Sequence, residues 1–172
     1  PDTFERLKAA SQADARWHVF NLALGQVRDK LVLNRMKVSV FDSLRQPSVD
    51  ETVEYDGLNV VVGSSEVDVE RLDELLPRCQ EVHGFKRPFL KTDTQGFDLE
   101  VFRGASGVHE RLTGIQCELS LKRIYSDSPT MAEALKVYEA DGFDLAGLFP
   151  VHPGQVPIIE MNCYLLRSGR VQ

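Results

Sequence analysis

The sequence predicts an α/β fold, because strand-like and helix-like segments alternate through its second half. Short apolar runs predict strands at residues 88–92, 115–121, 143–148 and 160–166. Two helices are expected between them, at residues 97–105 and 130–140. In the first helix Phe97, Val101 and Ala105 lie four residues apart and therefore share one face. This alternation is typical of right-handed crossovers in a mostly parallel sheet.

The last two predicted strands are expected to be antiparallel neighbours. The segment that joins them contains Pro150, Pro153, Gly154 and Pro157, and no helical pattern fits within it. Because parallel strands need a long crossover connection, this short loop favours antiparallel pairing. The predicted sheet is therefore mostly parallel, with an antiparallel strand at its C-terminal end.

The first half of the chain has weaker patterns. A short helix is predicted after the capping residues Asp2 and Thr3. Strands are predicted at residues 17–24, 30–33 and 59–62. A further helix is expected after residues 67–69 and should stop at Pro77, because proline breaks the helical hydrogen-bond ladder. The polar stretch 35–58 is predicted to be a long loop.

Composition limits the classes of function. The chain has 172 residues, of which 42% are hydrophobic and 27% charged, as expected for one soluble domain. Its net charge of −6 argues against a nucleic-acid partner, which needs a basic face. No apolar run is long enough for a membrane span, and no signal peptide is visible. A cytoplasmic protein is therefore expected.

The cysteines and histidines do not indicate a disulfide framework or a metal site. Cys79, Cys117 and Cys163 are odd in number and widely spaced, which fits a reducing compartment. Cys117 and Cys163 lie in apolar runs and are interpreted as small core residues. The four histidines share no metal-ligand spacing.

One run of residues carries a family resemblance. The segment Phe89-Leu90-Lys91-Thr92-Asp93-Thr94-Gln95-Gly96-Phe97-Asp98-Leu99-Glu100-Val101, with Gly104-Ala105 after it, resembles the hallmark of FkbM-type methyltransferases. Further segments agree in order and spacing: Pro1 to Leu7, Asn21 to Gly25, Arg71 to Leu76, Gln116 to Leu121, Gly142-Phe143 and Gly147 to Pro150. The resemblance covers nearly the whole chain.

The resemblance implies a Rossmann-like class I methyltransferase sheet in a single domain, residues 1–172. It also implies that the family's first two strands, with the glycine-rich turn and the acidic ribose ligand, lie before Pro1. The sequence contains no Gly-x-Gly loop. We therefore expect an N-terminally truncated domain that corresponds to its C-terminal two-thirds. Without those strands, apolar strand faces and two sheet edges should be exposed, and the isolated chain should be poorly stable.

The resemblance further implies S-adenosylmethionine as cofactor and a methyltransferase activity. The expected acceptor is a hydroxyl group on a small molecule or glycan: a glycan, a lipid-linked sugar or a secondary metabolite. Asp93 follows a parallel strand at the end where ligands bind in open α/β sheets, and is the predicted group that positions or deprotonates the acceptor. The alternative is that Asp93 only caps the following helix.

Glu118, on the next strand, is the predicted catalytic partner of Asp93. Two carboxylates in one crevice could divide acid and base roles or hold a divalent metal ion. The alternative is a buried structural glutamate paired with Lys91 or Lys122. The sequence does not specify an oligomeric state.

Further binding residues are assigned from the same resemblance. The predicted cofactor-binding residues are Asn21, Ala23, Asp93 and Gln95. The predicted acceptor-binding residues are Gln95, Ser120 and Tyr125. His152, in the loop after Pro150, could also reach an acceptor.

Two other hypotheses remain open. The chain could be a non-catalytic binding or scaffold module, which the missing glycine-rich loop would favour and the intact run from Asp93 to Gly96 would not. It could also be a different doubly wound protein that binds a nucleotide or a flavin, although no phosphate-binding loop occurs in the sequence.

Overall fold

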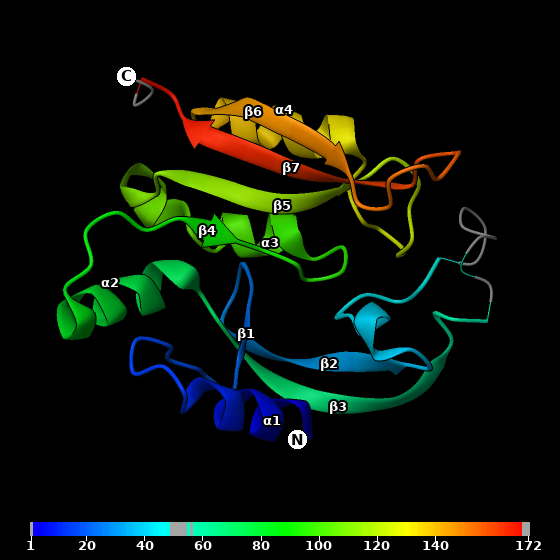
Figure 1. Ribbon diagram of the computed structural model, residues 1–172, viewed down its shortest axis with the longest axis horizontal. Helices are drawn as coiled ribbons and strands as arrows, with labels where there is room; N and C mark the ends of the chain where they lie inside the picture. Colours follow the sequence, from blue (N-terminus) through cyan, green and yellow to red (C-terminus); the bar gives the residue numbers. More distant parts are fainter. Residues whose placement is uncertain (1, 49–54, 56, 170–172) are drawn as a thin grey trace.

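The computed structural model describes residues 2–48, 55 and 57–169, and its strands form two sheets (Figure 1). The first sheet has the strand order β1-β3-β2 and the second the order β4-β5-β7-β6. The predicted α/β class is confirmed. The mostly parallel arrangement is not confirmed, because only the β1–β3 and β4–β5 pairs are parallel.

The first sheet is dominated by a long antiparallel ribbon. β3 (Val61–Glu70) pairs with β2 (Asp29–Met36), and β1 (Ala23–Leu24) adds a short parallel strand. Exposed and half-buried residues alternate along β3, as expected for a strand with one covered face. Helix α1 (Asp2–Ser11) precedes this sheet, as predicted.

The second sheet is more deeply buried. It consists of β4 (Leu90–Lys91), β5 (Gly114–Ser120), β7 (Glu160–Arg167) and β6 (Phe143–Pro150). The predicted antiparallel pairing of the last two strands is confirmed, and β7 also pairs antiparallel with β5. Figure 1 shows α3 (Asp98–Arg103) and α4 (Met131–Ala140) behind this sheet.

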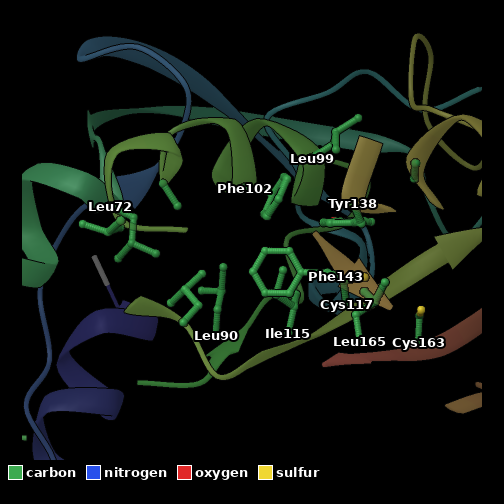
Figure 2. Close-up of a cluster of buried hydrophobic side chains, with 14 of the residues drawn as sticks. Leu72, Leu90, Leu99, Phe102, Ile115, Cys117, Tyr138, Phe143, Cys163 and Leu165 are labelled. Atoms are coloured by element: carbon green, nitrogen blue, oxygen red, sulfur yellow. The ribbon is translucent and has the colours of Figure 1, made fainter. Parts of the chain in front are cut away.

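The main hydrophobic core lies between the second sheet and these helices. Figure 2 shows Phe102 from α3 among side chains of α4 and the strands. The Phe102 ring meets those of Tyr138 and Phe143 edge-on, at centroid distances of 4.6 and 5.7 Å. It also stacks on His109, which lies in the 3₁₀ helix η3 (Ser106–Arg111). This aromatic cluster fixes α3, and therefore the turn that precedes α3, against the sheet.

Helix α4 begins where the sequence predicts. Thr130 is its N-cap, and the Thr130 and Glu133 side chains form a reciprocal capping box. Helix α2 (Leu72–His83), in contrast, continues through Pro77, so the predicted end at this proline is wrong. Leu72 and Leu76 are buried in the main core, and this burial holds the helix together across Pro77.

Two strand predictions in the first half agree only in part with the structure. Residues 17–24 were expected to form one strand, but only Ala23–Leu24 pair, and Trp17 is exposed. The strand predicted at 59–62 is only partly right: residues 61 and 62 begin β3, which continues through residues 67–69 because it pairs with β2 along an antiparallel ladder. The predicted strand at 30–33 is confirmed within the longer β2.

The loop predicted at 35–58 is largely irregular where it is described, apart from the short 3₁₀ helix η1 (Ser39–Phe41). Residues 49–54 and 56 lie outside the described part of the chain. Within residues 2–48, 55 and 57–169, no helix combines the length and the apolar character needed to cross a bilayer.

The two sheets meet where α3 ends beside β1. The backbone N–H of Asp73 donates to the carbonyl oxygen of Gly104 at 3.0 Å, which joins α2 to the end of α3. A Cβ atom at Gly104 would lie 2.0 Å from the carbonyl oxygen of Gly25. The backbones approach so closely that only glycine fits at residue 104.

We predict that Gly104→Ala destabilises the protein by about 3 kcal/mol, because the new methyl group must displace the backbone of Gly25. Urea unfolding followed by circular dichroism measures the loss. Gly63→Ala is the matched control, because its methyl group meets only the flexible end of the Arg35 side chain. Equal stability of the two variants would contradict this close approach.

Candidate active site

A left-handed turn follows β4 and begins the site. Gln95 and Gly96 both have positive φ angles, of 52° and 82°. A Cβ atom at Gly96 would lie 2.9 Å from Cδ2 of Tyr125, so the ring of Tyr125 packs directly on the glycine. This conformation is rare for residues with a side chain, so the turn must be held by its surroundings.

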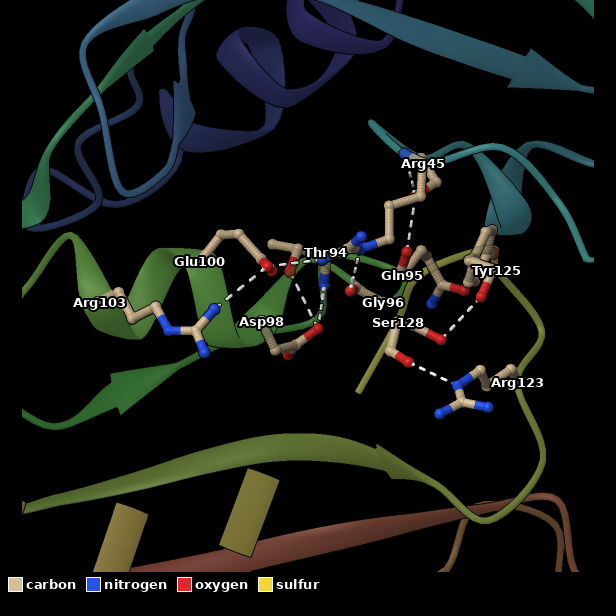
Figure 3. A network of polar contacts seen from close by, with 11 residues as sticks. Arg45, Thr94, Gln95, Gly96, Asp98, Glu100, Arg103, Arg123, Tyr125 and Ser128 are labelled. Atoms are coloured by element: carbon tan, nitrogen blue, oxygen red, sulfur yellow. Dashed lines mark hydrogen bonds and ion pairs between the residues drawn. The ribbon is translucent and has the colours of Figure 1, made fainter. Parts of the chain in front are cut away.

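The loop after β2 holds the turn from one side (Figure 3). Ser43 donates its hydroxyl to the carbonyl oxygen of Gln95 at 2.6 Å, and Arg45 Nε donates to the carbonyl oxygen of Gly96 at 2.7 Å. The guanidinium of Arg45 also forms a 2.5 Å ion pair with Glu100 of α3, in which both side chains are largely buried. This charged pair ties the loop of the first sheet to the helix of the second.

The segment after β5 holds the turn from the other side. Its residues 124–126 run beside residues 46–48: Ser48 N donates to the carbonyl oxygen of Ile124 at 2.8 Å, and Ser126 N donates to that of Gln46 at 2.8 Å. The hydroxyl of Tyr125 donates to Gln95 Oε1 at 2.8 Å. The Tyr125 side chain is buried, and burial raises its pKa, so the hydroxyl remains a donor.

The side chain of Gln95, held by Tyr125, in turn orients the carboxylate of Asp93. The amide nitrogen Nε2 of Gln95 donates to Asp93 Oδ1 at 3.1 Å. Lys91 Nζ lies 3.4 Å from the other carboxylate oxygen, Oδ2. The Asp93 side chain is 49% exposed, so its carboxylate is fixed in direction and remains open to a ligand. Asp93 is therefore not the cap of α3, since its oxygen atoms face Gln95 and Lys91.

Two hollows meet at Asp93. The first has a volume of about 410 Å³ and is mainly apolar, with leucines of the first sheet and Phe97 in its wall. The second has a volume of about 480 Å³ and is acidic, with Asp42, Glu118 and Glu160 in its wall. Asp42 and Asp93 line both hollows, so a ligand in one lies next to a ligand in the other across these two carboxylates.

The acidic hollow raises the proton affinity of its carboxyl groups. Burial, followed by the negative charges of Asp93 and Asp98, raises the pKa of Glu118 to about 7. Burial and the charge of Glu118 raise the pKa of Glu160 to about 8. Near neutral pH Glu118 can therefore accept a proton, whereas Glu160 largely keeps its own.

Asp98 lies behind this hollow at the start of α3. Its Oδ2 atom accepts from the Thr94 hydroxyl at 2.9 Å, while Oδ1 is buried and has no hydrogen-bond partner among the described residues. Burial raises the pKa of Asp98. A small hollow of about 20 Å³, roughly the space of one water molecule, lies between Asp98 and Glu118.

The structure brings together most of the predicted site residues. Ala23 and Asp93 line the apolar hollow, and Asp93, Gln95 and Glu118 line the acidic one. Three predicted binding residues lie elsewhere. Asn21 lines a separate hollow beside Arg28 and Asp68, Ser120 is buried against the small hollow near Asp98, and Tyr125 is buried behind Gln95.

Several residues of the site have no signal in the sequence. Asp42, Ser43 and Arg45 lie in the irregular loop at 35–58, which has no periodicity. Glu160 begins β7 and faces the hollow together with Glu118, because Glu160 pairs with Ser120, which lies two residues from Glu118 on the same face of β5. The packing of Tyr125 on Gly96 is seen only in the structure, because the two residues are far apart in the sequence.

A divalent metal ion is not supported. The parts of the chain that the structure describes contain no group of three or more His, Cys, Asp or Glu side chains arranged to hold a metal ion. The raised pKa values of Glu118 and Glu160 also disfavour the ionised carboxylates that a divalent cation needs.

Comparison with known proteins gives one match. A family model described as the methyltransferase FkbM domain matches residues 3–145, which is most of the chain. The matched region includes the turn at Gln95–Gly96, Asp93 and Glu118. No curated protein and no solved structure matches the chain.

We predict that stability falls as pH rises from about 5 to about 8. The pKa values of Glu118 and Glu160 in the folded chain exceed the 4.5 of an exposed glutamate, so the folded state holds protons that the unfolded state has released. Urea midpoints across this pH range measure the effect. Glu118→Gln and Glu160→Gln should flatten the slope, whereas Glu81→Gln on the exposed face of α2 should not. A rising midpoint would contradict the buried carboxyl cluster.

Proposed function

We propose that this chain, which belongs to the FkbM methyltransferase domain family, carries the reaction site of an S-adenosylmethionine-dependent O-methyltransferase. The observation that supports this most directly is the meeting of an apolar and an acidic hollow at Asp42 and Asp93. A methyl donor in one hollow and an acceptor in the other would be held next to each other. Such alignment of two reactants accounts for much of the rate enhancement in displacement reactions.

The apolar hollow fits part of the cofactor. Phe97 and the leucines Leu22 and Leu33 offer a surface for a flat, apolar ring such as adenine. The carboxylates of Asp42 and Asp93 at its edge suit a positive charge such as a sulfonium. When bound, S-adenosylmethionine supplies an electrophilic methyl group. Ala23 and Asp93 are the residues of this chain that we assign to the cofactor side, whereas Gln95 lines the hollow of the acceptor.

Asp93 orients the acceptor. Because Gln95 and Lys91 fix its carboxylate, Asp93 can accept a hydrogen bond from an acceptor hydroxyl in one direction. Tyr125 contributes indirectly, since it holds the Gln95 amide that in turn holds Asp93. Asp93 therefore directs the oxygen atom of the acceptor toward the neighbouring hollow.

Glu118 takes the proton from the acceptor. Its pKa of about 7 is close to neutral pH, where a general base combines adequate basicity with a sufficient ionised fraction. Glu160, with a pKa of about 8, remains protonated at neutral pH and can donate a hydrogen bond to a second acceptor oxygen. His152 lies in the same wall and can contact the acceptor.

The hollow favours an uncharged acceptor. Its described lining contains four carboxyl groups, and neither lysine nor arginine. A phosphate or carboxylate beside the reacting hydroxyl would be repelled by these groups. A hydroxyl of a glycan, of the sugar of a lipid-linked saccharide or of a secondary metabolite meets this condition.

We predict that Asp93→Asn and Glu118→Gln in the full-length protein each lower methyl transfer at least about 100-fold, because each removes one step of acceptor activation. Transfer is measured with isotopically labelled S-adenosylmethionine and a panel of glycan and polyol acceptors. Calorimetric affinity for S-adenosylmethionine should change less than transfer in Glu118→Gln.

Glu81→Gln, on the exposed face of α2, is the control and should retain activity. Cofactor binding without transfer to any acceptor, in the unmodified protein, would instead favour a non-catalytic binding module. Unchanged transfer in both Asp93→Asn and Glu118→Gln would remove this site from the mechanism.

The pH dependence of kcat/KM supplies an independent prediction. Because Glu118 acts in its ionised form, activity should rise with pH through an apparent pKa of about 7. In Glu118→Gln this rising limb should disappear from the residual activity. A limb that persists unchanged in the variant would assign the base to another group.

A further inference from the structure

Two cysteines face each other in the middle of the second sheet. Cys117 of β5 and Cys163 of β7 are direct partners in the antiparallel ladder. Both have free thiols and both are buried. Neither takes part in the site described above, because they lie on the face of the sheet that packs against α3 and α4 (Figure 2).

The ladder fixes how far apart they lie. Leu121 N donates to the carbonyl oxygen of Ile159 at one end, and Arg167 N donates to that of Thr113 at the other. Hydrogen-bonded and non-hydrogen-bonded residue pairs alternate along an antiparallel ladder. Leu121 and Thr113 each belong to a hydrogen-bonded pair, and each lies four residues, an even number, from Cys117. The two cysteines therefore form a backbone hydrogen-bonded pair of the ladder, with a Cα–Cα distance of about 5.5 Å. This value falls within the range of about 4.4–6.8 Å that a disulfide requires.

Both side chains also point to the same face of the sheet, because direct partners in a ladder share a face. The neighbouring Cys117 thiol lowers the pKa of Cys163, and the neighbouring Cys163 thiol together with burial raises the pKa of Cys117. Cys163 is therefore the thiol that ionises first, and the Cys117 thiol lies beside it. A nucleophilic thiolate next to a resolving thiol is the arrangement from which disulfides form.

We propose that Cys117 and Cys163 form a reversible redox site, in which a small peroxide closes a disulfide between β5 and β7. The Cys163 thiolate attacks one oxygen atom of hydrogen peroxide, which breaks the O–O bond, releases hydroxide and leaves a sulfenic acid. The Cys117 sulfur then attacks the Cys163 sulfur, forms the S–S bond and displaces hydroxide, while the Cys117 proton converts one hydroxide to water. Including the proton that Cys163 releases on ionising, the two thiols are oxidised by two electrons and one peroxide becomes two water molecules.

The position of the pair favours a small oxidant. Both thiols lie inside the core, and β7 is covered on both edges by β5 and β6. Cys79, in contrast, is half-buried on α2 and has no cysteine opposite it. Cys79 is therefore an internal reference for oxidation that does not depend on the ladder.

The test treats the folded, full-length protein with graded hydrogen peroxide, alkylates free thiols under acidic denaturing conditions and maps the peptides by mass spectrometry. We expect one linked pair, which contains Cys117 and Cys163 and lacks two hydrogen atoms, and which dithiothreitol reverses. The oxidised protein should melt at a higher temperature, because the link closes a long loop of the unfolded chain.

Two matched variants distinguish the oxidation of this pair from oxidation that involves Cys79. Cys79→Ser should form the same link, whereas Cys163→Ala should form none. The proposal is overturned if Cys117 and Cys163 are both alkylated at a peroxide concentration that fully oxidises Cys79. It is also overturned if the link joins Cys79 or if Cys163 proceeds irreversibly to the sulfinic acid.

Discussion

The left-handed turn at Gln95–Gly96 is the constraint on which the site depends. A positive φ angle is costly at Gln95, which has a side chain, but not at Gly96, and the conformation of Gln95 persists because other segments hold it. Tyr125 packs on Gly96, and Ser43 and Arg45 bind the two carbonyl oxygens of the turn. These partners come from both sheets, so the same hydrogen bonds that shape the turn also join the two halves of the molecule.

The turn matters for chemistry because it sets the direction of Asp93. Without the amide of Gln95, the half-exposed carboxylate would rotate freely in solvent and would offer no fixed geometry to a ligand. Glu118 depends on a different effect. Its proton affinity comes from burial and from the neighbouring carboxylates, so the role as a base that we propose for Glu118 depends on the crowding that makes the hollow acidic. The site thus combines a group fixed by hydrogen bonds with a group tuned by its surroundings.

The elements that are predicted accurately are those whose sequence pattern is local. β5, α4 and β7 have uninterrupted local patterns, and α4 has its own capping residues, so the sequence predicts them nearly to the residue. The strand predicted at 59–62 covers only the start of β3, because Gly63 and the two serines after it interrupt the apolar pattern. The ladder with β2, which no local pattern reveals, holds these residues in one strand. Pro77 illustrates the same limit, since burial of the α2 face outweighs the effect of one proline.

The sequence alone determined the α/β class, the resemblance over the hallmark run and the candidate residues Asp93, Gln95 and Glu118, because each belongs to a local pattern. Only the tertiary structure decided that Asp42 and Glu160 share a hollow with them, and that Tyr125 lies behind Gln95. It also decided that Cys117 lies opposite Cys163. The physical reason is that these relations depend on strand register and on the path of an irregular loop, and both are set by packing between segments far apart in the chain.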